Sequence, residues 1–322
     1  MYQVSILVPI YRVENYIERC VRSLMEQTYP NIQYVFVDDC SPDMSIFILK
    51  KVLCDYEKRI KYIKIVSHLQ NRGLAAARNS AIENATGSFV CHVDSDDYLE
   101  RNAIELLVNE QIRSGADIVS CNSYMHTNNG IKQIIEPNYK NKEEMVCSLI
   151  RADINHTIWR RLINISLYRN NNVRAEEGCN QGEDWQVFPI LTYYAQSFSK
   201  VNHCLYHYEC TNQNSHVLLT SNTVNEKLWA QDLRSMYIVK NFFYPKGSVY
   251  KNAVTEMEKA FLFSYLFKSA YLNSRYHYNF YLEKIFSSDI PQKGWNNMLC
   301  RYLIKNYTLI RLYIKFKRIF NK

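Results

Sequence analysis

Short apolar runs alternate with amphipathic stretches along the first hundred residues of the chain. The runs are rich in Val and Ile, which is typical of parallel strands buried on both faces. In the stretches between them, apolar residues recur three and four positions apart, which predicts helices with one apolar face. The expected strands are residues 4–8, 33–37, 60–66 and 88–93, and the expected helices are residues 17–25, 42–56 and 74–84. This alternation predicts right-handed βαβ units and an α/β fold with a doubly wound, mostly parallel sheet flanked by helices.

The pattern loosens after residue 98, and the later elements are expected from weaker signals. The expected helices are residues 101–114 and 142–151, and the expected strands are residues 117–124, 131–135 and a segment around Tyr206. From residue 223 onward, aromatic residues at helical spacing predict packed helices. We therefore expect two parts, with the sheet in residues 1–215 and a helical region in residues 216–322.

Composition narrows the class of protein. With 47% hydrophobic and 22% charged residues, the 322-residue chain is globular and can form one large domain or two modest ones. Its ten cysteines are scattered without a C-x-x-C pair, so the sequence indicates neither a zinc site nor a disulfide framework. We find neither a signal-peptide pattern nor an apolar run long enough to span a bilayer. These features predict a cytoplasmic protein with reduced thiols.

The positive charge is concentrated at the C-terminal end. Residues 296–322 contain seven Lys and Arg residues and no Asp or Glu, while the whole chain has a formal net charge of +8. Bulky apolar side chains are interleaved with these charges at helical spacing, which predicts a basic amphipathic helix that binds an anionic membrane surface. A solvated helix face packed against the body is the alternative. A nucleic-acid partner is not expected, because the interleaved aliphatic side chains suit lipid better than a phosphate backbone.

Three carboxylates, those of Asp94, Asp96 and Asp97, directly follow the apolar run of residues 88–93. Carboxylates at the carboxyl end of a strand lie where open α/β sheets bind ligands. Like charges this close together need a partner, and hard oxygen ligands suit Mg²⁺ or Mn²⁺ held together with substrate phosphates. A solvated turn is the alternative, because Asp and Ser favour turns.

Two further segments follow neighbouring strands and predict a nucleotide site. Tyr11 can stack on a base, and Asp38 or Asp39 can accept a hydrogen bond from a base or a ribose, with helix capping as the alternative. The chain lacks a G-x-G-x-x-G motif, which argues against a dinucleotide site. Neutralisation of phosphates would fall to a metal and to Arg72 or Arg78, although Arg78 can equally be a structural anchor.

A second acidic pair, Glu183 and Asp184, follows Gly182 and starts another apolar helix. The helix dipole favours acids at such a position, which is one explanation. A carboxylate directed into a cleft can also act as the general base that deprotonates a hydroxyl nucleophile. The spacing of the residues leaves these two interpretations even.

Five segments together resemble the family 2 glycosyltransferases with the GT-A fold, of the bacterial polysaccharide-biosynthesis type. They occur in the order typical of that family and span roughly residues 1–207. The segments are residues 4–11 (VSILVPIY), 37–41 (VDDCS), 71–79 (NRGLAAARN), 94–97 (DSDD) and 182–185 (GEDW). The resemblance implies transfer of a sugar from a nucleotide-diphosphate sugar, expected to be a UDP-sugar, to a hydroxyl group with inversion at the anomeric carbon.

The resemblance also assigns roles by position. It implies that Asp184 is the catalytic base with support from Glu183, and that Asp94 and Asp96 form the D-x-D element on the ribose side and the metal side. The residues that it places around the nucleotide donor are Pro9, Tyr11, Asp39, Arg78, Asp94 and Asp97, with Asp39 facing the base and Arg78 near the diphosphate.

Four further positions complete the expected site. Trp159 matches a segment that often borders the acceptor in the family, and His207 or His216 is expected as a third metal ligand. Cys40 departs from the family, which usually has Gly in its D-D-G-S turn. A residue other than Gly takes a positive φ less readily, so the conformation of this turn is in question.

These expectations define a metal-dependent enzyme that works with Mn²⁺ or Mg²⁺ at the inner face of the plasma membrane. Its acceptor is expected to be a glycan or a lipid-linked glycan in surface polysaccharide biosynthesis. One alternative is a protein that binds a nucleotide sugar without catalysis. A nucleic-acid-binding protein that uses the basic tail is a weaker alternative, and salt-sensitive binding to duplex DNA would favour it.

Overall fold

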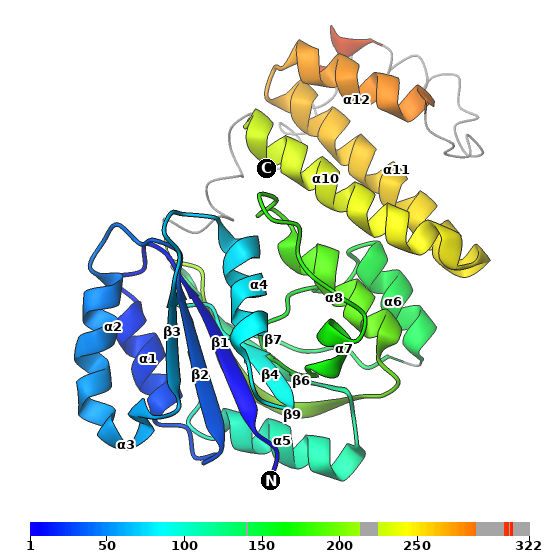
Figure 1. Cartoon of the computed structure of the whole chain (residues 1–322). Coiled ribbons are helices and arrows are strands. Elements are labelled where there is room, and N and C mark those ends of the chain that lie inside the picture. The colour runs from blue at the N-terminus through cyan, green and yellow to red at the C-terminus, as the bar shows by residue number, and fades with distance from the viewer. Residues whose placement is uncertain (140, 213–224, 288–305, 309, 312–322) are drawn as a thin grey trace.

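The computed structural model describes residues 1–139, 141–212, 225–287, 306–308 and 310–311. Among these residues nine strands form one sheet with the order β3-β2-β1-β4-β8-β6-β9-β5, and β7 pairs with β6 off this path (Figure 1). The strands are β1 (Val4–Ile10), β2 (Ile32–Asp38), β3 (Ile63–Ser67), β4 (Phe89–His92), β5 (Tyr98–Leu99), β6 (Ile118–Thr127), β7 (Gly130–Ile134), β8 (Arg161–Asn164) and β9 (Phe198–Glu209). The helices are α1 (Ile17–Met25), α2 (Ser45–Leu53), η1 (Cys54–Tyr56), α3 (Glu57–Ile60), α4 (Leu74–Asn84), α5 (Ala103–Ser114), α6 (Lys142–Ile150), α7 (Ser166–Arg169), α8 (Glu183–Tyr194), α10 (Glu226–Phe243), η2 (Tyr244–Lys246), α11 (Ser248–Tyr271) and α12 (Arg275–Ser287).

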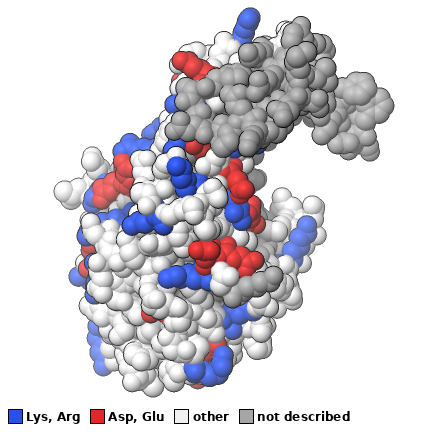
Figure 2. Space-filling view, turned by 90° about the vertical axis from the view of Figure 1, so that its right-hand side faces the viewer, with Lys and Arg blue, Asp and Glu red and all other residues white. Residues whose placement is uncertain are grey.

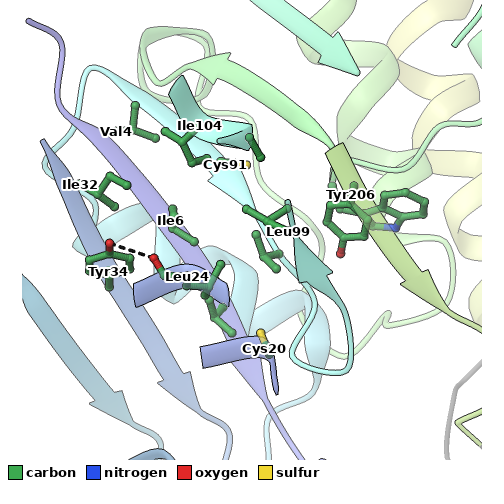
Figure 3. Packing of buried hydrophobic residues seen from close by; sticks show 14 of the residues in the cluster. Val4, Ile6, Cys20, Leu24, Ile32, Tyr34, Cys91, Leu99, Ile104 and Tyr206 are labelled. Carbon is green, nitrogen blue, oxygen red and sulfur yellow. Dashed lines mark hydrogen bonds between the residues drawn. The ribbon is translucent and has the colours of Figure 1, made fainter. Parts of the chain in front are cut away.

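The first half of the sheet is parallel, as the sequence predicts. Strands β3, β2, β1 and β4 pair in parallel, and every residue of β1 is buried. Alternate residues of β1 face opposite layers: Ile6 belongs to the cluster that contains α1, and Leu7 to the cluster that contains the alanines of α4. Figure 3 shows Ile6, Leu24 and Tyr34 in the first cluster, where the Tyr34 hydroxyl donates to the Leu24 carbonyl over 3.1 Å. Burial on both faces explains why this strand is a continuous apolar run.

The second half of the sheet is mixed. Strand β8 lies antiparallel between β4 and β6, β9 runs parallel to β6, and β5 pairs antiparallel with β9. The strand expected over residues 60–66 begins later, at Ile63. The charged residues before it form the short helix α3, and a turn hydrogen bond from Tyr62 N to Arg59 O separates that helix from the strand.

The helical region expected after residue 223 is confirmed by α10, α11 and α12. Helices α10 and α11 pack on α8 and α6, and Trp185 of α8 shares an apolar cluster with Met236 and Phe243 of α10 (Figure 1). A division of the chain at residue 215 stays a prediction. The basic segment of residues 296–322 lies largely outside the described residues, and none of the described helices is long and apolar enough to cross a membrane.

Candidate active site

The acidic loop that begins at Asp94 lies where the strand order reverses. The chain passes from β1 to β2 and β3 on one side and returns to β4 on the other side of β1. Such a switch point opens a crevice at the carboxyl ends of the strands, where α/β sheets bind ligands. The pairing between β1 and β4 continues to Val93, whose N–H donates to Leu7 O over 3.0 Å. The position predicted for the acidic stretch is therefore the position observed.

Arg78 brings three carboxylates together at this crevice. Its guanidinium lies 3.0 Å from Asp94 Oδ1, 3.5 Å from Glu183 Oε1 and 3.6 Å from Asp184 Oδ1. The side chain is only 5% exposed, because it projects from the buried face of α4. Burial alone would lower the pKa of this guanidinium, but Asp94, Asp184 and Glu183 outweigh burial and raise it. Arg78 therefore stays charged and links the acidic loop to the second acidic pair.

Glu183 and Asp184 start helix α8, and Gly182 precedes them in the left-handed conformation with φ 72°. Asp184 Oδ2 accepts from Ile158 N over 3.4 Å, and Asp184 Oδ1 has no hydrogen-bond donor among the described residues. Burial raises the pKa of both carboxyls, and for Glu183 the neighbouring Asp184 raises it further. A buried carboxylate with a raised pKa and one oxygen that accepts no hydrogen bond has the properties of a general base.

The other two carboxylates of the acidic loop differ in their surroundings. Asp96 Oδ2 accepts from Asn212 Nδ2 over 2.8 Å, and burial, followed by the charge of Asp94, raises the pKa of Asp96 to about 6. Asp97 is 0% exposed and faces β9, where it accepts from the Tyr206 hydroxyl over 2.5 Å and from Glu209 N over 2.8 Å. The structure thus ties Asp97 to the sheet and leaves Asp94 and Asp96 closer to the open side of the loop.

The residues fit a divalent cation that is shared with a substrate. Asp94 Oδ1 is buried without a hydrogen-bond donor although it pairs with Arg78, and Asp96 keeps its ionised form only at a cost. No group of three or more His, Cys, Asp or Glu side chains gathers as a complete metal cage within the described part of the chain. One or two carboxylates together with substrate phosphates are what Mg²⁺ commonly uses, so a complete cage is not required.

The expected third metal ligand is not identified. His207 stacks on Tyr98 with ring centroids 4.1 Å apart, and its two nitrogens lie 2.9 Å from His126 Nε2 and from Glu100 Oε1. His216 lies outside the described residues. Both ring nitrogens of His207 therefore have partners other than a metal in this structure, and a role of His207 as a metal ligand stays a prediction.

The residues expected around the nucleoside lie at the ends of β1 and β2. Pro9 is buried in β1, and Tyr11 follows the strand with 39% of its surface exposed. Asp39 is 2% exposed and accepts four hydrogen bonds. The donors are Arg72 N, Gly73 N, Asn71 Nδ2 and, at 2.7 Å from Oδ1, His68 Nδ1. These bonds occupy both oxygens of the Asp39 carboxylate, which joins β2 to the loop before α4.

Cys40, at the position where the family pattern expected Gly, lies in the left-handed region of the backbone. Its φ is 56°, in the left-handed region, and its side chain is exposed. Next to it, Ser41 Oγ accepts from Arg12 N over 2.8 Å, which connects this turn to the end of β1. Cys40 thus takes a positive φ despite its side chain, which costs about 1–2 kcal/mol of strain at this residue.

Trp159, expected at the acceptor side, is only 4% exposed. Its indole stacks on Tyr206 and Tyr208 of β9, with centroids 4.6 Å and 5.1 Å away. Figure 3 shows Tyr206 at the edge of the apolar cluster. Tyr206 also accepts from Asp94 N over 3.1 Å, so it supports the acidic loop at two points. Nothing in the sequence pattern indicated this role of Tyr206 beyond the strand expected around it.

Comparisons with known proteins show the family to which the chain belongs. Residues 5–174 match the family described as Glycosyl transferase family 2, and the chain belongs to this family. It is 31% identical over 189 residues to the uncharacterized glycosyltransferase EpsJ of Bacillus subtilis, covering 56% of this chain and 53% of EpsJ. It is 27% identical over 250 residues to the minor teichoic acid biosynthesis protein GgaB of the same species, covering 74% of this chain and 27% of GgaB. The chain thus spans about half of EpsJ and a smaller part of GgaB.

The fold has a close counterpart among solved structures. Residues 1–349 of Staphylococcus aureus TarS, in complex with UDP-GlcNAc, superpose with a TM-score of 0.74 and 18% identity. The match covers 98% of this chain and 92% of the TarS fragment, so it includes the C-terminal helices. The expected GT-A fold with a helical C-terminal region is confirmed.

Proposed function

We propose that this chain transfers a sugar from a nucleotide-diphosphate sugar to a hydroxyl group of a glycan or lipid-linked glycan acceptor, with inversion. The observation that carries the proposal is the buried Arg78, which holds Asp94 of the donor side and Asp184 of the acceptor side within 3.6 Å of one guanidinium. Donor phosphates and acceptor hydroxyl would thereby meet at one point. A UDP-sugar is the proposed donor, and the complex of TarS with UDP-GlcNAc supports this choice.

Asp184 is the proposed base. Its Oδ1, which accepts no hydrogen bond from the described residues, takes the proton of the acceptor hydroxyl while the acceptor oxygen bonds to the anomeric carbon. The bond from that carbon to the diphosphate oxygen breaks, and its electron pair leaves with the nucleoside diphosphate. Glu183 supports Asp184 through their shared contact with Arg78. Attack opposite to the leaving group inverts the configuration, and no protein nucleophile is required.

The donor is held at the crevice between β1 and β4. Tyr11 offers an exposed ring for the base, Pro9 is buried in the strand that leads to it, and Asp39 holds the loop before α4 through its bonds to Arg72 N and Gly73 N. Asp94 and Asp96 would hold Mg²⁺ or Mn²⁺, which supplies charge stabilisation to the departing diphosphate. Asp97 contributes to donor binding indirectly: its hydrogen bonds to Tyr206 and Glu209 of β9 hold the loop that carries Asp94 and Asp96.

The biological setting is part of the proposal. The similarity to a protein named for teichoic acid biosynthesis supports an acceptor in surface polysaccharide assembly. On the face shown in Figure 2, the described Lys and Arg side chains are interspersed with Asp and Glu. Most of the net charge of +8 lies in residues 296–322, which favours attachment of this segment to an anionic membrane at the cytoplasmic side.

A vesicle assay tests the attachment. The full chain is expected to sediment with phosphatidylglycerol vesicles and to remain in solution with phosphatidylcholine vesicles. Charge reversal of Lys315, Lys317 and Arg318 to Glu should abolish sedimentation without touching the described fold. Equal sedimentation of this variant and the unchanged chain would contradict attachment through the tail.

A donor screen tests the activity. Release of nucleoside diphosphate is measured for a panel of UDP-sugars with and without Mn²⁺, in the presence of a membrane extract as the acceptor source. Release is expected from one donor, only with metal, and is expected to be lost in Asp96→Asn and Asp184→Asn. Asp153→Asn, at an exposed ion pair with Arg151, is the matched control and should keep full activity. Calorimetry that detects no binding of UDP or a UDP-sugar would overturn the proposal.

A further inference from the structure

Helix α10, which lies beyond the residues that match the family, holds the segment that leads into the candidate base. Gln231 of α10 accepts with one oxygen, Oε1, from Asn180 N over 3.0 Å and from Gln181 N over 3.1 Å. Ser235, one turn further along α10, donates to Gln181 O over 2.6 Å. These three bonds fix successive peptide groups immediately before Glu183 and Asp184 of α8.

The same segment is anchored on its other side to the helix that carries Arg78. Asn180 Oδ1 accepts from Ala75 N, at the start of α4, over 3.1 Å. The side chain of Asn180 also fills the space next to Gly73, where a Cβ atom would lie 2.2 Å from Asn180 Nδ2. The segment of residues 179–182 is thus held between α10 and α4.

The side chains of α10 that contact this segment are buried. Gln231 is 8% exposed and Ser235 is 0% exposed. Gln186 of α8 donates to Ser235 Oγ over 2.8 Å, so the serine bonds both to the segment and to the helix that follows it. At Gly182 a Cβ would lie 3.3 Å from Ser235 Oγ, and the positive φ of Gly182 turns the chain directly into α8. A shift of the segment would therefore move the first turn of α8.

We propose that Gln231 is a positioning residue for the transfer reaction: it holds residues 179–182 so that Asp184 stays beside Arg78. The inference rests on the proposed function, because it takes Asp184 as the base. It makes the C-terminal helical region part of the active site and not only a packing partner. The two N–H groups that Gln231 accepts from are partly buried and would lose their acceptor together if the side-chain amide were removed.

Two substitutions and one control separate positioning from general stability. Gln231→Met keeps the length of the side chain and removes the acceptor, and Gln231→Glu keeps an oxygen that can accept both N–H groups. Gln111→Met is the matched control, since Gln111 of α5 is a buried glutamine with a similar exposure of 7% and lies outside this segment.

Two readouts are taken on the full chain. Hydrogen–deuterium exchange at the Asn180 and Gln181 amides needs no ligand, and it should rise in Gln231→Met while staying near the unchanged value in Gln231→Glu and Gln111→Met. With the UDP-sugar that gives the most nucleoside diphosphate in the screen, kcat of Gln231→Met should fall ~10–100-fold with a smaller change in KM. Gln231→Glu should recover most of the lost kcat.

The outcomes are distinguishable. Unchanged exchange at these amides in Gln231→Met would overturn the inference whatever the activity. Faster exchange with an unchanged kcat would show a structural role only and would also overturn it. Full activity of Asp184→Asn would instead overturn the proposed base, and it does not depend on the variants at Gln231.

Discussion

Removal of the guanidinium of Arg78 is the sharpest test of how the site is built. Arg78→Met keeps much of the side-chain volume but leaves Asp94, Glu183 and Asp184 without their shared cation. At separations of 3.0 and 3.6 Å, the contacts of Arg78 with Asp94 and Asp184 each carry roughly 5 kcal/mol of Coulomb energy for an effective dielectric constant of about 20. Most of this is offset by the cost of burying the charges. The expected net loss in the free energy of unfolding is about 3–5 kcal/mol, the range for removal of one partner from a buried ion pair.

The loss should depend on pH in a defined direction. Without Arg78, the pKa values of Glu183 and Asp184 in the folded protein rise further above those in the unfolded chain, which are about 4.3 and 3.9. A carboxyl with a raised folded-state pKa favours the folded protein at low pH, and that contribution is lost as the pH increases. The stability difference between the unchanged chain and Arg78→Met should therefore shrink as the pH is lowered from 7 to 5.

Urea denaturation followed by tryptophan fluorescence at both pH values measures this difference. Arg113→Met is the control, because Arg113 is 73% exposed and pairs with Glu110 at the surface, and it should leave the midpoint unchanged at both pH values. A loss for Arg78→Met that is equal at pH 5 and pH 7 would refute the assignment of Arg78 as the shared partner of these carboxylates. Nucleoside diphosphate release should also be lost, since donor side and acceptor side are no longer held together.

Three other predictions follow from named groups in the site. Burial raises the pKa of Asp184, so kcat should increase with pH as Asp184 loses its proton, with a midpoint above the ordinary Asp value of about 3.9. A pH–rate profile that is flat down to pH ~3.9 would contradict Asp184 as the base. Tyr206→Phe removes the hydroxyl that donates a hydrogen bond to Asp97 and should lower the free energy of unfolding by ~1–3 kcal/mol. An unchanged urea midpoint would argue against a stabilising role of this hydrogen bond. Cys40→Val places a β-branched side chain at φ 56° and should cost roughly 1–2 kcal/mol in the same assay, whereas Cys40→Gly should fold at least as stably as the unchanged chain; equal stability of the valine variant would contradict strain at this turn.

The parallel half of the sheet was predictable because its signal is local and strong. Strand β1 is a continuous apolar run, and the alanine-rich segment of α4 begins and ends where its sequence pattern does. The mixed half was not predictable in the same way. Strand β8 contains Arg161 and Asn164, and β5 has only the two residues Tyr98 and Leu99, so neither shows a usable periodicity. Their strand character comes from neighbours that lie far away in the sequence.

The sequence also located the acidic groups better than their partners. Motif order identified Asp94 and Asp184, but the fact that both contact Arg78 depends on which face of α4 packs against the crevice. Asp97 looks like its two neighbours in the sequence, and only the Tyr206 hydroxyl and the Glu209 N–H of β9 turn it into the interior. Gln231 has no sequence signal at all, since a single glutamine in an amphipathic helix is ordinary. Residues that act through contacts across the fold are the ones that a sequence pattern does not reveal.

The charge balance of the site explains why a donor would arrive with a cation. Asp94, Asp96, Glu183 and Asp184 surround the crevice, and Arg78 is the cation that the described residues place among them. Burial already raises the pKa of three of these carboxyls, so additional negative charge would be met by uptake of protons and loss of the base. A bare diphosphate would add such charge, whereas a diphosphate neutralised by Mg²⁺ or Mn²⁺ would not. Binding of the cation next to Asp96 should keep the Asp96 carboxylate ionised. The other carboxylates would leave an excess of negative charge near Asp184, and this charge maintains the affinity for a proton that a general base needs.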